Sequence, residues 1–248
     1  MPDEHVMWAE AFAPSPHRTL TLESAEALRA VVDEARDRRV KVLVLTGGAD
    51  AWCVGGDLAA FDAASDRAAY IDELARRLHE VVEALQALAA IVVTVVDGVA
   101  AGAGMPLAAA GDIVLASDRA RFTLGYTKLG LSPDGGTTLL THTLGVHRTL
   151  YAALVNPVLS AQRAHEVGLV AEVLPPEDLV PRARELAALL ASGSADSLAA
   201  TKRLVREAAV PDPVAALVRE QTALVGLAGR PQAQEGIRAF LEKRPARL

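Results

Sequence analysis

The stretch from Ile91 to Gly111, IVVTVVDGVAAGAGMPLAAAG, decides the fold. Its first six residues are all β-branched and predict a buried strand, because their stiff side chains suit a pleated surface. Asp97-Gly98 ends that strand, and Pro106 suits the first turn of a helix, where a missing N–H does no harm. We therefore expect a strand that turns sharply into a helix, with residues 102–104 at the junction.

This junction consists of glycine and alanine, which let a ligand or another main chain approach closely. A helix N-terminus also leaves N–H donors unpaired and carries a partial positive charge. Such a place can hold an oxygen that develops negative charge, although a tightly packed joint would use the same residues. Neither common nucleotide-binding loop is present, because Leu107 stands where the dinucleotide motif needs glycine and Gly-Lys-Ser/Thr does not occur.

The composition narrows the class of protein. With 248 residues and 51% hydrophobic content, the chain suits one large domain or a core with a small appendage. A net charge of −6 argues against a nucleic-acid partner, which needs a basic face. Residues 1–5 are too polar for a signal peptide, and Asp97 and Pro106 interrupt the apolar run in which a membrane span would lie. We expect a cytoplasmic protein without membrane partners.

The remaining pattern predicts alternating strands and helices over the first two-thirds of the chain. Such alternation favours parallel strands joined by crossover helices. Predicted strands lie at 6–12, 40–46, 91–96, 112–116, 121–124 and 169–173, predicted helices at 25–38 and 70–88, and predicted loops at 49–58 and 125–136. The chain from about Asp178 onwards is mostly helical.

Several separate stretches resemble motifs of one enzyme family. They are Trp52–Leu58 (WCVGGDL), Val96–Gly104 (VDGVAAGAG), Leu129–Thr137 (LGLSPDGGT), Leu159–Val173 and Glu235–Arg244. All five occur in the expected order. The chain therefore resembles the crotonase superfamily, the enoyl-CoA hydratase/isomerase family, over about residues 6–244.

The resemblance implies an α/β fold with a crotonase-like ββα spiral core over 1–177 and a C-terminal helical lid and trimerisation region over 178–248. It also implies an acyl-CoA thioester substrate, with coenzyme A carried as part of the substrate and no separate cofactor, and a homotrimer or dimer of trimers. In this family two main-chain N–H groups hold the thioester carbonyl, and the matching residues here are Gly56 and Ala103. Such donors stabilise an enolate oxygen by about 3–4 kcal/mol each.

The family also suggests which residues contact the coenzyme A part of the substrate. Val54, Asp57 and Leu58 match the loop along the adenine and pantetheine. Phe240 and Lys243 match residues that reach the nucleotide from a neighbouring subunit. Lys243 would make a charge-assisted contact with a phosphate, or it is simply an exposed charge on a terminal helix. We expect no metal, since no His, Cys, Asp and Glu set has the spacing of metal ligands.

The sequence departs from the hydratase pattern at the catalytic carboxylates. The family's hydratases carry two glutamates, and the matching residues here are Pro106 and Tyr126, neither of which can act as a carboxylate base. Asp134 remains, and family members with an aspartate in this loop include isomerases and dehalogenases. Taken alone, Pro-Asp-Gly-Gly is also a ready turn, in which Asp134 would cap a local N–H or the helix that starts at Thr137.

We therefore predict an enoyl-CoA isomerase-like enzyme in which Asp134 moves a proton between carbons. The alternatives are an enoyl-CoA hydratase, an acyl-CoA hydrolase or dehalogenase that uses Asp134, and a CoA-ester binding protein without turnover. We expect Tyr126 either to donate a hydrogen bond to the substrate or to lie in the core. We expect His79 to be solvated, and His142 and His147 to be at the surface or structural. We expect Cys53 to be a packed residue.

Overall fold

The main sheet of the computed structural model, which describes residues 2–12, 15, 17–209 and 212–247, is parallel throughout. Its five strands lie in the order β1-β2-β4-β6-β9. They are β1 (Val6–Glu10), β2 (Val42–Thr46), β4 (Ile91–Val96), β6 (Ile113–Ser117) and β9 (Glu172–Leu174). The parallel pairing expected from the alternation of strands and helices is confirmed.

A second, smaller sheet has the order β3-β5-β7-β8. Its strands are β3 (Ala51–Cys53), β5 (Val99–Ala101), β7 (Arg121–Thr123) and β8 (Leu159–Ser160), and only the pair β7–β8 is antiparallel. Each of β2, β4 and β6 in the main sheet is followed directly by a strand of the second sheet. This repetition is the ββα spiral that the resemblance implied.

The structure corrects three local expectations. The strand at 91–96 does not lead straight into the helix, because β5 intervenes after Asp97-Gly98. The predicted loop at 49–58 contains β3 and the first residue of α2 (Leu58–Ala63). The strand expected at 169–173 is β9 at 172–174, since the amides of Leu169 and Val170 bond instead to the carbonyl of Ala164 in α7 (Ala161–Glu166).

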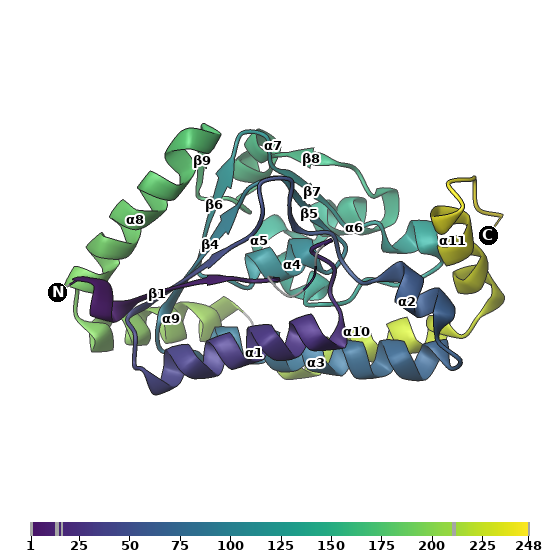
Figure 1. Ribbon diagram of the computed structural model, residues 1–248, viewed down its shortest axis with the longest axis horizontal. Coiled ribbons are helices and arrows are strands. Elements are labelled where there is room, and N and C mark those ends of the chain that lie inside the picture. Colours follow the sequence, from purple (N-terminus) through teal and green to yellow (C-terminus); the bar gives the residue numbers. More distant parts are fainter. Residues whose placement is uncertain (1, 13–14, 16, 210–211, 248) are drawn as a thin grey trace.

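Helices cover both faces of the main sheet (Figure 1). Alternate residues of each strand point to opposite faces, so Leu43 and Leu45 of β2 join one core cluster and Val42 and Val44 join another. The first cluster includes α1 (Leu22–Asp37) and α3 (Arg67–Ala87), and the second is covered by α8 (Pro176–Ser192). The predicted division at 177/178 falls inside α8 and stays a prediction.

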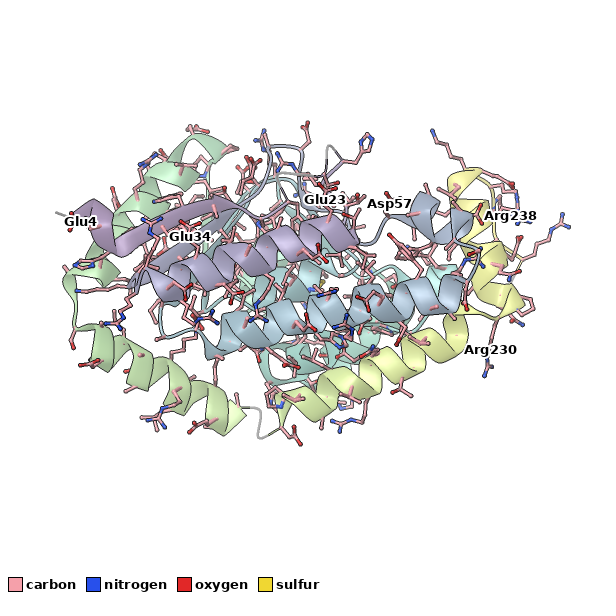
Figure 2. The ribbon with its side chains drawn as sticks, turned by 60° about the horizontal axis from the view of Figure 1, so that its bottom comes forward. Glu4, Glu23, Glu34, Asp57, Arg230 and Arg238 are labelled. Atoms are coloured by element: carbon pink, nitrogen blue, oxygen red, sulfur yellow. The ribbon has the colours of Figure 1, made fainter. Side chains whose placement is uncertain are left out.

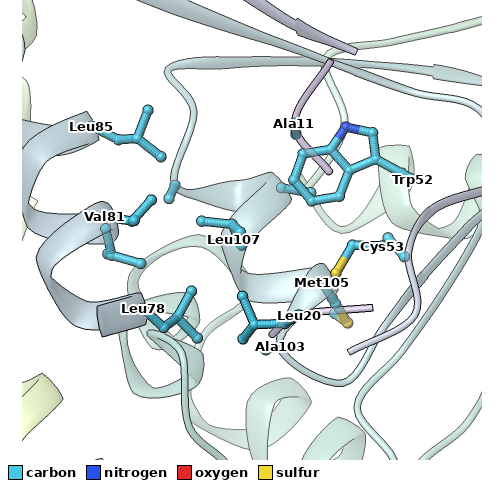
Figure 3. Close-up of a cluster of buried hydrophobic side chains, with 14 of the residues drawn as sticks. Ala11, Leu20, Trp52, Cys53, Leu78, Val81, Leu85, Ala103, Met105 and Leu107 are labelled. Carbon is cyan, nitrogen blue, oxygen red and sulfur yellow. The ribbon is translucent and has the colours of Figure 1, made fainter. Parts of the chain in front are cut away.

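Three long helices lie side by side on the face away from α8, namely α1, α3 and α10 (Pro213–Ala228) (Figure 2). The buried stripe of α3 includes Leu78, Val81 and Leu85, which lie beside Ala103 and Leu107 of the strand–helix junction (Figure 3). The buried side of α3 thus packs against the strand–helix junction.

The remaining helices complete the chain. They are η1 (Pro2–His5), α4 (Gly104–Ala109), η2 (Tyr126–Leu129), η3 (Thr137–Leu139), α5 (Leu140–Leu144), α6 (Val146–Val155), α9 (Ala195–Ala209) and α11 (Pro231–Leu241). The helix α4 begins at Gly104, inside the predicted Gly-Ala junction, and Pro106 lies in its first turn. Within the described ranges, no helix is long and apolar enough to cross a membrane.

Candidate active site

The loop after β3 and the turn after β5 pack main chain against main chain. A side-chain carbon added at Gly55 would lie 3.2 Å from the Cα of Gly102, and one added at Gly104 would lie 2.4 Å from the carbonyl oxygen of Cys53. Any larger residue at Gly104 would therefore push the two segments apart. This close packing brings the segment with Gly56 and the segment with Ala103 together.

The two amides singled out from the sequence are both free to bind a ligand. Ala103 is the first residue before α4, and Gly56 is held in a bridge to Leu20, whose amide donates to Gly55 and whose carbonyl accepts from Asp57. Among the residues that the structure describes, neither the amide of Gly56 nor that of Ala103 donates a hydrogen bond. Free donors at a helix start are what an oxyanion site requires.

Asp134 is brought to the same place by the loop after η2. A side-chain carbon at the next residue, Gly135, would lie 3.5 Å from the Cα of Ala103. The Asp134 side chain is buried, with the residue 3% exposed, and its Oδ1 lies 2.7 Å from Nε2 of His79. Among the residues that the structure describes, the hydrogen-bond partner of this carboxylate is His79 rather than a local amide, as the turn interpretation would have it.

His79 is the partner that the sequence analysis missed, and the expectation that it is solvated is wrong. The residue is only 5% exposed, because it lies on the buried stripe of α3 next to Leu78 and Val82. Burial alone would lower the pKa of His79, but the hydrogen bond and charge of Asp134, with smaller contributions from Glu220 and Glu83, raise it above the ordinary value. The contact with Asp134 therefore favours the protonated form of His79.

Glu220 of α10 caps the segment that follows Asp134. Its carboxylate accepts hydrogen bonds from the amides of Gly136 (2.8 Å), Thr137 (3.2 Å) and Thr138 (2.6 Å), and from the hydroxyl of Thr138. The residue is 4% exposed, and burial raises its pKa against the opposing effect of these bonds. The sequence did contain a signal for this buried position. Glu220 follows Leu217 by three residues and precedes Leu224 by four, so it lies on the same buried face of the helix.

Tyr126 directs its hydroxyl to the main chain of Asp134. Its O–H donates to the carbonyl of Asp134 at 3.2 Å, and the hydroxyl of Thr137 donates to the same oxygen at 2.8 Å. Burial, together with the nearby charge of Asp134, raises the pKa of Tyr126 well above the ordinary value, so the phenol stays protonated. Tyr126 is partly buried and packs against the core, and a hydrogen bond from it to the substrate stays a prediction.

His79, Asp134 and Glu220 together form a set whose ligand atoms lie within 4.8 Å of one another. Sequence spacing could not reveal this set, since its members come from α3, a loop and α10. The bonding favours a polar network over a metal centre, because Glu220 already accepts four hydrogen bonds and His79 contacts Asp134 directly. The donor set therefore fits a cation poorly.

The residues matched to coenzyme A belong to the loop that leads into α2, the start of α2, and the end of α11 with the residues just after it, and α11 packs on α2. Asp57 caps α2 by accepting from the amides of Ala59 (3.0 Å) and Ala60 (3.1 Å), and Figure 2 labels it at the start of that helix. Leu58 packs against the core, whereas Val54, Phe240 and Lys243 are exposed. Contact with coenzyme A stays a prediction for all five residues.

Three other side chains lie where they were expected. Cys53 is fully buried, and burial raises its pKa to about 12, so its thiol is a packed group rather than a nucleophile. His142 and His147 are exposed at the surface.

Comparison with known proteins connects this geometry to one family. The family model for enoyl-CoA hydratase/isomerase matches residues 9–248. The chain is 36% identical over 245 residues to 1,2-epoxyphenylacetyl-CoA isomerase of Escherichia coli, covering 91% of this chain and 92% of that protein. It is 34% identical over 211 residues to 2,3-dehydroadipyl-CoA hydratase of the same organism, covering 85% and 81%. An enoyl-CoA hydratase structure from Mycobacterium avium subsp. paratuberculosis superposes with a TM-score of 0.89 at 31% identity, covering 99% and 95%.

Proposed function

Because the chain belongs to the enoyl-CoA hydratase/isomerase family, we propose that it shifts the double bond of an enoyl-CoA thioester, with Asp134 as the proton shuttle. The observation that carries this proposal is the buried Asp134 carboxylate, which is paired with His79 and whose neighbour in the chain, Gly135, packs against Ala103. No cofactor is required, since coenzyme A is part of the substrate.

The proposed reaction moves one proton. The amides of Gly56 and Ala103 bind the thioester carbonyl oxygen, and the Asp134 carboxylate removes a proton from the α carbon of a 3-enoyl-CoA. The electron pair left by that proton delocalises into a dienolate, whose oxygen the two amides stabilise. Asp134 then returns the proton to the γ carbon, which yields the 2-enoyl-CoA with no change in composition.

Addition of water through two glutamates has less support. Family hydratases place glutamates where this chain has Pro106 and Tyr126. Pro106 is buried in α4, and Tyr126 binds the main chain of Asp134. Among the described residues the second carboxylate of the cluster is Glu220, which already accepts four hydrogen bonds and so is not available to orient a water molecule.

The substitution Asp134→Asn tests the shuttle in D2O. The wild type should convert 3-enoyl-CoA to 2-enoyl-CoA with deuterium entering the product, whereas the variant should lose at least about a hundredfold in kcat and keep similar affinity for the thioester. Asp37→Asn, at an exposed position, is the matched control. A variant at position 134 with full activity would show that another group carries the proton.

A second candidate function rests on His79. In a dehalogenase, Asp134 would attack a substrate carbon and displace halide, and water would then cleave the aspartyl ester. In a hydrolase, Asp134 would attack the thioester carbonyl and displace the CoA thiolate, and water would then cleave the resulting anhydride. In both, His79 would first release its proton to solvent and then take a proton from that water. The 2.7 Å contact between the two side chains favours this alternative over a passive binding protein. Release of free CoA from saturated acyl-CoA, or halide from a halogenated acyl-CoA, would identify it.

We also propose that Val54, Asp57, Leu58, Phe240 and Lys243 contact coenzyme A and that the chain forms a trimer or dimer of trimers. The exposed apolar side chains of α6 and the residues just after it support self-association. They are Val146, Leu150, Tyr151, Leu154, Val155 and Val158.

A further inference from the structure

A pocket of about 910 Å³ is lined in part by residues of the segments that carry His79 and Asp134. It is bounded by α3, α4, α5, α9 and the start of α10. Two of its lining residues connect it to the candidate site: Gly136 follows Asp134 by two positions, and Pro106 lies in the same short helix that Ala103 precedes. A third, Val82, lies one helical turn after His79 on α3.

The wall of this pocket nearest the site is apolar. Val82, Pro106 and Leu139 line it, with Leu88, Leu140 and Val214 further along. Pro106 stands where family hydratases carry a glutamate, so this wall holds no carboxylate at that position.

The basic residues of the pocket are already paired. The Lys202 ammonium bonds to Asp112 (2.8 Å) and to the carbonyls of Leu85 (2.9 Å) and Ala90 (3.1 Å), and burial lowers its pKa. The Arg206 guanidinium bonds to the same Asp112 and to the carbonyls of Ala110 and Gly111. Neither cation is free to bind an acid group. The third basic residue, Arg203, pairs with Glu207 at 3.6 Å, and the remaining charged lining residues are Glu83 and Asp196.

From these observations we infer that the pocket receives the acyl chain of the substrate, and that this chain is uncharged and of medium length. The inference rests on the proposed function, because the thioester held at Gly56 and Ala103 would direct its acyl carbons past Asp134. The volume lies near the upper end of the range of about 300–1,000 Å³ typical of small-molecule pockets. A short butenoyl chain would leave most of it unfilled.

The helix α9 sets the far wall. It presents the small side chains of Ala199 and Ala200 to the pocket, and the ion pairs of Lys202 and Arg206 fix the helix against the start of β4 and the end of α4. A large side chain at position 199 would therefore fill the pocket rather than displace the helix. This identifies α9 as the element that determines chain length.

A series of 3-enoyl-CoA substrates from butenoyl to decenoyl tests the inference. For the wild type, kcat/KM should rise by up to about fourfold with each methylene that the pocket buries. Ala199→Trp should abolish this rise, so that its kcat/KM falls further below that of the wild type with each added methylene. Leu204→Trp, on the exposed side of α9, is the matched control and should keep the wild-type slope. A hexenoyl chain that ends in a carboxylate should be turned over at least about tenfold more slowly than hexenoyl-CoA, because its charge loses hydration without a partner.

Calorimetric binding of saturated acyl-CoAs of the same lengths separates this inference from the proposed function. Chain-length-dependent affinity that Ala199→Trp removes would support the pocket even if no substrate is turned over. Turnover without dependence on chain length, or a slope that Ala199→Trp leaves intact, would overturn the inference and leave the proposed function standing. Ala199→Phe, a smaller change, serves if the tryptophan variant does not fold.

Discussion

At the scale of single residues, the contact between His79 and Asp134 is the most consequential feature of the molecule. An isolated carboxylate would be strongly disfavoured at this depth, and an isolated imidazolium likewise. Paired, the two can stay charged beside the free amides of the junction. The pair thus keeps a basic oxygen available in a site from which water is largely excluded.

This pairing predicts a pH-dependent stability. The pKa of His79 is raised in the folded protein from its ordinary value of 6.5, so the folded state binds its proton more tightly than the unfolded state does. The stabilisation is complete below pH 6.5 and disappears as the pH rises through the folded pKa. Urea unfolding across this window should show the free energy of unfolding falling with pH.

The variant His79→Gln should flatten that slope and lower the free energy of unfolding by about 3–5 kcal/mol at the acidic end, because Asp134 is left buried without its partner. His142→Gln, at an exposed histidine, should retain the slope. A wild-type slope in His79→Gln would mean that some other group titrates here.

The residues of the site that stand in local sequence motifs could be predicted, whereas those contributed by distant helices could not. Gly56, Ala103 and Asp134 stand in local motifs, whose spacing is visible in the chain. His79 and Glu220 reach the site only because α3 and α10 pack against the same loop, and no local pattern marks a tertiary contact between distant segments. For His79, polar neighbours along the helix suggested solvent, whereas the helical period places it among buried residues.

At the scale of elements, one helix caps another through a buried carboxylate. The three amides at the start of η3 would be expected to find a cap within their own segment, but α10 supplies it through Glu220. Because η3 begins three residues after Asp134, the position of α10 affects how the 134–138 segment lies against Ala103.

Substitution of Glu220 should therefore affect activity through Asp134. Glu220→Ala leaves buried N–H groups without acceptors, at about 1–3 kcal/mol each, and frees the Asp134 segment to shift. We expect a lower melting temperature and a loss of kcat of about a hundredfold, which is the effect of an ångström-scale misplacement, with thioester affinity largely kept. Gln221→Ala, next to it on the exposed side of α10, should do neither. A fall in affinity with unchanged kcat would contradict this role.

The elements differ in how far sequence could predict them. The strand β4 has six β-branched residues and was predicted with its observed bounds. β5 is a run of Val-Ala-Ala, which is too short, and has side chains too small, to show an alternation of apolar and polar residues. It forms a strand because β3 and β7 pair with it on either side. Short strands of this kind depend on their neighbours rather than on their own residues.

At the scale of the whole molecule, the exposed apolar face of α6 is unusual for a chain that folds so completely around its core. Val146, Leu150 and Leu154 follow one another at intervals of four and are 57%, 50% and 64% exposed. Contiguous patches of this kind are typical of interaction surfaces. The opposite face of α6 packs inward through Thr149, Ala152 and Ala153, so the outward residues contribute nothing to the fold of a single chain.

The proposed assembly can be tested on this face. Light scattering of the wild type should give three or six times the chain mass of 26.0 kDa. Leu154→Asp should reduce it to the mass of one chain, because a buried carboxylate without a partner outweighs the apolar contacts of the patch. The matched control is Leu189→Asp on α8, which alters a leucine of similar exposure outside the patch. Dissociation by Leu189→Asp but not by Leu154→Asp would place the contact between copies on α8 instead, and a wild type with the mass of one chain would contradict assembly itself.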